Sequence, residues 1–303
     1  MRATPITTTH PEEARARCDA ARGRGARVAF VPTMGALHEG HLRLIDAARE
    51  RGGFVAVSVF VNPTQFAPGE DFSTYPRDLA GDVSKLSERG VDLVLAPPVE
   101  AMYASDARTR VPVSDLTAGL CGPHRPGHFD GVATVVAKLL NIVGPCAAIF
   151  GRKDFQQLAV IRRLVADLDM PVEVVGVRTV RDSDGLALSS RNAYLSADER
   201  ARALAIPRAL TAAHSLFQSG ERRAEAIRAA VSDPVESAAD SVDYVAVADP
   251  GSLAEVRTGE ICGRALIAIA ARFGRTRLID NTVLGEDEPP CAPSDGPDAR
   301  RRP

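Results

Sequence analysis

Short runs of β-type residues alternate with helical patterns over the first 180 residues, and this alternation limits the fold more than any other feature. Residues 27–32 form a compact apolar run, which is followed by a glycine-containing turn and a helical pattern over 41–51. Residues 54–61 are rich in β-branched and aromatic side chains, which is typical of a strand buried on both faces. Because strands that alternate with helices pair in parallel, we predict an α/β fold with a Rossmann-like, doubly wound parallel sheet.

The pattern continues and then changes after about Arg181. Helices are predicted over 76–89, 131–143 and 154–168, with Asp154 as the cap of the last one, and strands over 91–96, 146–150 and 172–177. Beyond Arg181, helical patterns over 196–218 and 221–232 precede apolar runs over 242–249 and 264–273. We therefore predict a Rossmann-like domain over 1–182, a smaller C-terminal α+β domain over 183–284 and a disordered tail over 285–303.

Composition and charge exclude several classes of protein. Lysine and arginine total 37 against 39 acidic residues, so the net charge of −2 gives no reason to expect a nucleic-acid or anionic-membrane partner. The longest apolar runs fall short of the ~18 residues that a membrane-spanning helix needs. The N-terminus lacks the apolar segment of a secretory signal, and the five scattered cysteines never form C-x-x-C. We expect a reduced, cytoplasmic protein.

Residues 32–41 read PTMGALHEGH and lie between the first predicted strand and its helix. In an open α/β sheet, ligands bind at the carboxyl ends of strands, where helix N-termini favour anions. His38 and His41 can donate hydrogen bonds to phosphate oxygens, and Gly35 and Gly40 allow a ligand to approach the backbone. Capping histidines are the commoner explanation of an arbitrary H-x-x-H, and a zinc pair would need a third ligand that is not evident. After the first strand, however, H-x-G-H favours nucleotidyl transfer.

Two further polar segments suit a polyphosphate. Residues 151–154 read GRKD and again follow a strand, so Lys153 would place a point charge near a phosphate. Residues 188–192 read LSSRN, in which two hydroxyls accompany Arg191, a side chain that can grip two oxygens. Taken alone, the first is more simply an exposed basic loop, and the second is equally well a turn before a helix.

Neutral amides form the last group. Asn62 and Gln65 follow the second strand and Gln157 opens a later helix. Amides donate and accept hydrogen bonds without the desolvation cost of a charge, so they suit a small, uncharged, hydroxylated substrate, although each alone is more often a surface residue. The segment RPGHF over 125–129 is interpreted as an ordinary turn.

Six motifs occur in one order: VPTMGALHEGH, FVNPTQF, YPRD, RPGHFDGVATVVAKL, GRKDFQQLAVIRRLVAD and DGLALSSRN. With them the chain resembles the pantothenate synthetase (pantoate–β-alanine ligase) family, which belongs to the nucleotidylyltransferases with H-x-G-H and a K-M-S-K-S-like loop. The resemblance is dense over roughly 25–200 and continues weakly to Asn281. It implies that ATP and pantoate give pantoyl adenylate and pyrophosphate, and that the β-alanine amine then displaces AMP to form pantothenate.

The resemblance also implies roles for individual residues. His38, His41 and Lys153 would be catalytic, with His41 as the proton donor, and Asp82 would be linked to Mg²⁺. Gln65, Gln157 and Asn62 would bind pantoate, and Gln65 would also contact β-alanine. A homodimer is implied, with a second domain that begins at LSSRN and closes as a lid. The ATP site would comprise Met34, Gly35, His38, Gly40, His41, Gly151, Lys153, Asp154, Val180, Leu188, Ser189, Ser190 and Arg191.

Three other interpretations compete with this one. A nucleotidylyltransferase that modifies a phosphate acceptor would call for Arg or Lys where Gln65 and Gln157 stand. A non-catalytic nucleotide-binding module would be expected to lose part of HEGH, Lys153 or SSR, all of which are intact. A tRNA-acylating enzyme is disfavoured by the chain's length and near-neutral charge.

Overall fold

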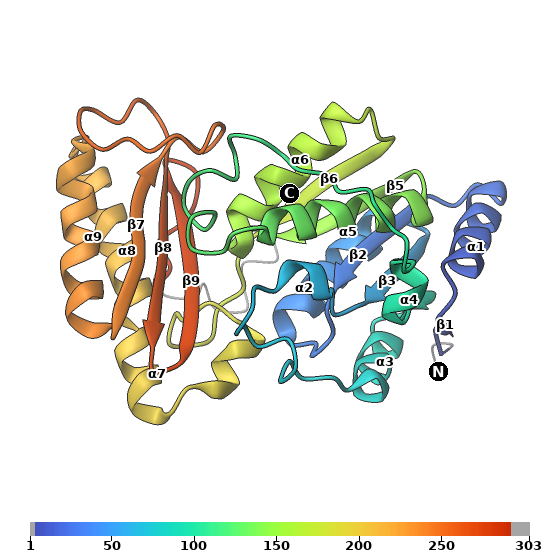
Figure 1. Ribbon diagram of the computed structural model, residues 1–303. Coiled ribbons are helices and arrows are strands. Elements are labelled where there is room, and N and C mark those ends of the chain that lie inside the picture. The colour runs from blue at the N-terminus through green and yellow to red at the C-terminus, as the bar shows by residue number, and fades with distance from the viewer. Residues whose placement is uncertain (1–3, 292–303) are drawn as a thin grey trace, which may run out of the picture. The chain divides into compact units, whose positions relative to one another are not determined.

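The computed structural model describes residues 4–291, which form two compact units (Figure 1). The first unit runs to Val180 and also includes Leu188–Ser190, and the second contains Arg181–Ala187 and the chain from Arg191 onwards. Of the predicted tail, residues 285–291 form turns and bends, and 292–303 lie outside the described residues. None of the helices within residues 4–291 is long and apolar enough to cross a membrane.

The first unit contains six parallel strands in the order β1-β4-β3-β2-β5-β6. From β2 the chain winds outwards through β3 to β4, and it then returns to place β5 on the other side of β2. The winding direction therefore reverses between β2 and β5, which is where open α/β sheets bind ligands. The predicted doubly wound sheet is confirmed. The strands are β1 (Ile6–Thr8), β2 (Val28–Thr33), β3 (Phe54–Val59), β4 (Leu93–Leu95), β5 (Cys146–Gly151) and β6 (Val172–Val177).

Right-handed crossovers distribute the helices of this unit over the two faces of the sheet. The crossovers that contain α2 and α3 step across the sheet towards the β1 edge. Those that contain α1, α5 and α6 step towards the β6 edge, so these helices lie on the opposite face. On the α2 face, Ile45 and Leu86 pack with Val31 and Val57 in one buried cluster. The helices are α1 (Pro11–Gly23), α2 (Glu39–Arg51), α3 (Leu79–Glu88), α4 (Val99–Met102), α5 (His128–Val143) and α6 (Phe155–Asp167), with short 3-10 turns η1 (Pro63–Gln65) and η2 (Arg152–Asp154).

The start of α6 differs from the prediction. Asp154 occupies the N-cap position, but its side chain makes no capping hydrogen bond. The chain approaches α6 through the 3-10 turn η2, so the backbone is already helical before the cap position is reached. The predicted capping role of Asp154 is therefore wrong.

The second unit is an antiparallel three-stranded sheet with helices on one face. Helix α8 contacts β9 and α9 contacts β7 (Figure 1). The predicted helix over 196–218 is divided at Leu204, three residues before Pro207, whose ring nitrogen cannot donate a helical hydrogen bond. The smaller C-terminal α+β unit is confirmed. Its elements are α7 (Ala197–Ala203), α8 (Ala205–Gln218), α9 (Ala224–Ala238), β7 (Ser241–Ala248), β8 (Ala265–Phe273) and β9 (Thr276–Leu284), preceded by the 3-10 turn η3 (Ser190–Tyr194).

Candidate active site

The loop between β2 and α2 is held in an unusual conformation. Gly35 and Ala36 both have left-handed backbones, with φ angles of 81° and 52°. The carboxylate of Asp82 accepts the backbone N–H of Ala36 at 2.9 Å and that of Leu37 at 2.8 Å. A Cβ atom on Gly35 would lie only 2.8 Å from Asp82 Oδ2. Glycine is therefore required at position 35 by both the φ angle and the space.

The two histidines of this loop form a capping box at the N-terminus of α2. Nδ1 of His38 accepts the backbone N–H of Gly40 at 3.1 Å, and Nδ1 of His41 accepts that of His38 at 3.4 Å. The ring centroids are 4.1 Å apart. A Cβ atom on Gly40 would come within 2.8 Å of the His38 ring, so the glycine of H-x-G-H makes room for the imidazole.

These contacts fix the tautomers of the two rings. Because each Nδ1 accepts a hydrogen bond, a neutral ring carries its proton on Nε2 and presents that N–H as a donor. Burial, with a smaller contribution from His38, lowers the pKa of His41 to about 3. Lys153 and Lys85 lower this pKa further, and Asp154 opposes them. Capping engages Nδ1 of each ring, so it does not conflict with a role of the Nε2–H groups in binding a ligand.

The GRKD segment lies beside the histidines. Gly151 ends β5, which pairs with β2 directly, and Arg152–Asp154 form the turn η2 that follows it. Charges on Lys153 and Asp154 both affect the pKa of His41, which shows that the two loops share one electrostatic environment. The sheet thus brings together at its switch point two segments that are more than 100 residues apart in the sequence.

Gln65 lies close to the histidine loop. Its Nε2 donates to Met34 Sδ at 2.9 Å, and its Oε1 accepts from Asn62 Nδ2 at 3.1 Å. Asn62 was expected among the substrate-binding residues, but it is 1% exposed. Its Oδ1 accepts from the hydroxyl of Tyr103 at 2.8 Å, and its Nδ2 also donates to the carbonyl of Gly131 at 3.1 Å. Asn62 therefore holds Gln65 in place, and a substrate would meet Gln65.

The segment RPGHF, interpreted from sequence as an ordinary turn, supports Gln65 from its other side. His128 Nδ1 lies 2.8 Å from the carbonyl oxygen of Gln65, and Arg125 donates to His128 Nε2 at 2.9 Å. Arg125 also forms a two-point ion pair with Glu70, at 2.7 and 2.6 Å. Sequence reasoning missed these three residues because their contacts join positions about 60 residues apart.

Two adjacent glutamines at the start of α6 have different environments. Gln156 is 7% exposed, and its side chain binds the backbone of the loop before α5 through Leu116, Gly119 and Cys121. Gln157 is half-buried. Gln156 therefore has a structural role, and Gln157 is the residue of the pair with surface available to a substrate.

The LSSRN segment is divided between the units. Leu188 donates its N–H to the carbonyl of Val180 at 2.9 Å, and its Cβ lies 3.7 Å from where a Cβ on Gly40 would be. The Ser190 hydroxyl lies 3.4 Å from that of Tyr75. Leu188, Ser189 and Ser190 thus belong to the unit that carries H-x-G-H, whereas Arg191 belongs to the second unit.

Asp82 is committed to backbone groups. It is 1% exposed, and both carboxylate oxygens accept backbone N–H groups. Within residues 4–291, no group of three or more His, Cys, Asp or Glu side chains is placed to hold a metal ion. The expected link between Asp82 and Mg²⁺ therefore finds no support in its contacts.

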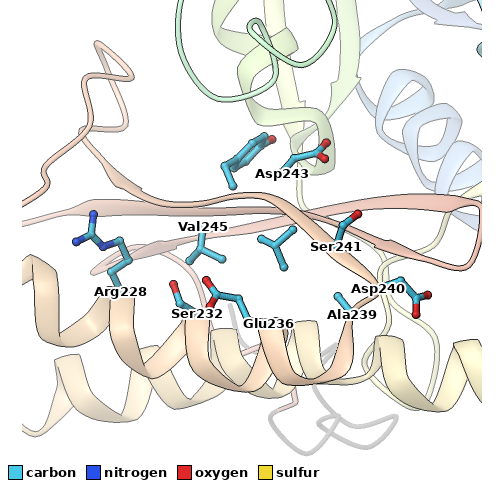
Figure 2. A pocket seen from close by; sticks show the side chains of 10 residues that line it. Arg228, Ser232, Glu236, Ala239, Asp240, Ser241, Asp243 and Val245 are labelled. Atoms are coloured by element: carbon cyan, nitrogen blue, oxygen red, sulfur yellow. The ribbon is translucent and has the colours of Figure 1, made fainter.

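A hollow of about 530 Å³ lies in the second unit between α9 and β7. Figure 2 shows Arg228, Ser232 and Glu236 on the helix and Ser241 and Val245 on the strand. None of the predicted site residues lines this hollow, so the candidate site remains at the end of the parallel sheet.

The switch-point position of H-x-G-H and the neighbouring lysine define the class of the protein as a nucleotidyl-transfer enzyme of the H-x-G-H type. Residues 6–283 match the family model described as Pantoate-beta-alanine ligase. The chain belongs to the pantoate–β-alanine ligase family, whose members are ATP-dependent ligases.

Named relatives agree with this assignment. A pantothenate synthetase of Geotalea uraniireducens is 52% identical over 91% of this chain and 98% of that protein. The crystal structure of pantothenate synthetase from Thermus thermophilus is 47% identical, covers 93% of this chain and 99% of that chain, and has a TM-score of 0.85. A pantoate–β-alanine ligase from Francisella tularensis, complexed with β,γ-ATP and β-alanine, is 30% identical with a TM-score of 0.76 over 94% of this chain and 99% of that chain.

Proposed function

We propose that this site activates pantoate with ATP through a pair of neutral imidazoles and one lysine. The observation that carries the proposal is that Nδ1 of both His38 and His41 accepts a backbone N–H, which leaves Nε2–H as the donor of each ring. Lys153, from the neighbouring loop, adds a fixed positive charge. Together these groups can bind the phosphate oxygens of ATP.

In the first step, a carboxylate oxygen of pantoate attacks the α-phosphorus of ATP. The new P–O bond forms as the bond to pyrophosphate breaks, which gives pantoyl adenylate. The reaction adds negative charge to an anionic centre, and prearranged donors that face this charge stabilise the transition state. The attacking carboxylate has no proton to lose. Burial lowers the pKa of His41 and favours its neutral form, so we assign it hydrogen bonding to the phosphates in the free enzyme.

In the second step, the uncharged amine of β-alanine attacks the acyl carbon of the adenylate. The C–N bond forms, the C–O bond to AMP breaks, and the amine gives up a proton to the departing phosphate or to water. We assign the positioning of pantoate to Gln65 and Gln157 and contact with β-alanine to Gln65. The ATP site in this proposal comprises Met34, Gly35, His38, Gly40, His41, Gly151, Lys153, Asp154, Val180, Leu188, Ser189, Ser190 and Arg191.

Three finer statements belong to the same proposal. Mg²⁺ would enter with the phosphates of ATP, as it commonly does in phosphoryl-transfer sites, and would neutralise their charge. The family resemblance supports a homodimer. Residues 4–291 contain no membrane-spanning helix, and the reduced cysteines suit the cytoplasm.

Pantoate-dependent exchange of labelled pyrophosphate into ATP, with β-alanine omitted, tests the proposal. Exchange that requires both pantoate and Mg²⁺ is the expected result, and added β-alanine should divert the adenylate to AMP and pantothenate. Absence of exchange in folded protein that binds ATP would refute the assigned substrate and redirect the search to other acids.

A further inference from the structure

We infer that Asp82 is a positioning residue for the adenylation step and acts with Lys85 as a clamp on the histidine loop. This inference rests on the proposed function of that loop. It assigns to Asp82 a task that differs from binding Mg²⁺, and it adds Lys85, which no motif singled out. We call these two side chains of α3, with their contacts to Ala36 and Leu37, the loop clamp.

The carboxylate of Asp82 is committed to the loop. It is 1% exposed and receives two backbone N–H groups, from Ala36 at 2.9 Å and Leu37 at 2.8 Å. A charged acceptor forms stronger hydrogen bonds than a neutral one, and burial raises the cost of leaving either group without its partner. Two successive amides held by one carboxylate fix the orientation of the two peptide planes that meet at the Ala36 Cα.

Lys85 binds a carbonyl group of the same turn, whereas Asp82 binds its N–H groups. Its ammonium donates to the carbonyl oxygen of Leu37 at 2.7 Å. Residues 82 and 85 are three apart on α3, so both side chains leave the same face of the helix. The N–H and the C=O of Leu37 therefore both bind α3, immediately before His38.

The clamped turn is one that the chain would not adopt readily by itself. Ala36 has a φ of 52°, a left-handed conformation that residues with a Cβ seldom adopt. Such a conformation persists where surrounding contacts determine it. The two hydrogen bonds of Asp82 lie on either side of the Ala36 Cα and hold Ala36 in this conformation.

The clamp also decides which groups remain for a phosphate. Gly35 donates its N–H to Thr33 Oγ1 at 3.2 Å, Ala36 and Leu37 donate theirs to Asp82, and His38 donates to His41 Nδ1 at 3.4 Å. The backbone of this loop thus has four successive N–H groups in use within the protein. Within this loop the imidazoles are then the groups that we assign to the phosphates of ATP, and their direction depends on the turn that Asp82 and Lys85 hold.

The test compares Asp82→Asn with Asp78→Asn. Both changes neutralise one carboxylate at the N-terminal end of α3, but Asp78 is exposed and caps its own helix through the N–H of Gly81. An amide in place of Asp82 retains one accepting oxygen and turns an NH₂ group towards a backbone N–H. We expect Asp82→Asn to lower kcat/KM for ATP in pyrophosphate exchange by roughly 10- to 100-fold, the scale of a misplaced catalytic group. Asp78→Asn should stay within about twofold of the unmodified protein.

Two readouts separate positioning from other roles. In Asp82→Asn the Mg²⁺ concentration for half-maximal rate should remain unchanged, and amide hydrogen exchange of residues 34–38 should be faster without any ligand. A raised Mg²⁺ requirement with rescue by excess Mg²⁺ would overturn the inference in favour of a metal ligand. Unchanged hydrogen exchange and unchanged kcat/KM would overturn it as well.

A second variant covers the case in which Asp82→Asn does not fold. Lys85→Met is then compared with the unmodified protein. Faster hydrogen exchange of the same amides is expected, and normal exchange would contradict the clamp. If the unmodified protein shows no pantoate-dependent pyrophosphate exchange, the proposed function fails, whereas the hydrogen-exchange comparison still accepts or rejects the clamp.

Discussion

His128 donates its Nδ1–H to the backbone carbonyl of Gln65 across 2.8 Å. The other ring nitrogen accepts from Arg125, which is itself held by the carboxylate of Glu70. Three side chains thus form a continuous chain of hydrogen bonds that ends on the backbone of the residue proposed to bind both pantoate and β-alanine. The order of donors and acceptors requires His128 to be neutral, because a protonated Nε2 would face the guanidinium.

The first prediction concerns Arg125→Lys. Lysine has one charged group and cannot bind Glu70 at two points while also donating to His128. We expect KM for pantoate to rise by roughly tenfold, the scale of one lost charge-assisted hydrogen bond, with KM for ATP within about twofold of normal. Steady-state kinetics with each substrate varied would measure this. Arg163→Lys on the exposed face of α6 is the control, and an equal rise in both KM values for Arg125→Lys would argue against a specific effect on Gln65.

The second prediction follows from the pKa of His128, which burial, and then Arg125, lower to about 4. An unfolded histidine titrates near 6.5, so as the pH falls from about 6.5 to about 4 the unfolded state binds a proton that the folded state does not. The contribution of this group to stability is therefore full above about pH 6.5 and is lost as the pH falls towards 4. His128→Gln removes the titration and retains a donor and an acceptor. Denaturant unfolding at several pH values should show a shallower loss of unfolding free energy in the variant, and equal slopes would contradict the assignment.

The large elements could be predicted because their apolar residues are large and regularly spaced. The apolar run that begins at Phe54 became β3, which is largely buried as inner strands of a parallel sheet are. The run over 172–177 became β6, an edge strand whose residues are half-buried or exposed. The sequence did not reveal α1, whose buried positions are the small residues Ala14, Cys18 and Ala21. Nor did it reveal β1, a strand of three residues at the edge of the sheet.

The site could be predicted where residue type and place in the fold were both informative. The sequence alone indicates that H-x-G-H after a strand binds phosphate. The structure adds that its glycine, Gly40, is needed because a Cβ there would meet the His38 ring. The contacts of Asp82 and His128 could not be foreseen, because they join these residues to partners about 45 and 60 residues away. A backbone group as a partner leaves no motif in the sequence.

The third prediction concerns Gly40→Ala. The new Cβ would lie 2.8 Å from the His38 ring, so the imidazole must turn away from the position in which its Nε2 faces a ligand. Alanine is also the better helix former, which makes loss of folding an unconvincing explanation for loss of activity. We expect pyrophosphate exchange to fall by about 10²-fold, as for other misplaced catalytic groups. Gly23→Ala, at the end of α1 with nothing within 4 Å of the new Cβ, is the matched control. Equal activity of the two variants would remove the His38 ring position from the mechanism.

The fourth prediction concerns the segment 183–195, which contains Arg191. An acyl adenylate is sensitive to water, so an enzyme that forms one benefits from closing a loop over it. We expect ATP with pantoate to slow tryptic cleavage after Arg191, whereas cleavage after the exposed Arg110 should continue at its usual rate. Mass spectrometry of the timed digest would measure both. Unchanged cleavage after Arg191 would mean that this segment does not close.

The fifth prediction is the loss of adenylation in Lys153→Ala. Lys153 adds positive charge near His41, and in the proposed reaction the attack of a carboxylate on the α-phosphorus builds up negative charge that such a cation would stabilise. Removing one electrostatic donor of this kind costs roughly 10²–10³ in rate. The chain offers a matched control in Lys138→Ala, because the Lys138 ammonium lies over the ring of Tyr103 and has no proposed contact with a phosphate. Pyrophosphate exchange should fall in the first variant and stay within about threefold in the second. A near-normal rate in Lys153→Ala would remove Lys153 from the mechanism and leave the imidazoles as the groups that stabilise the transition state.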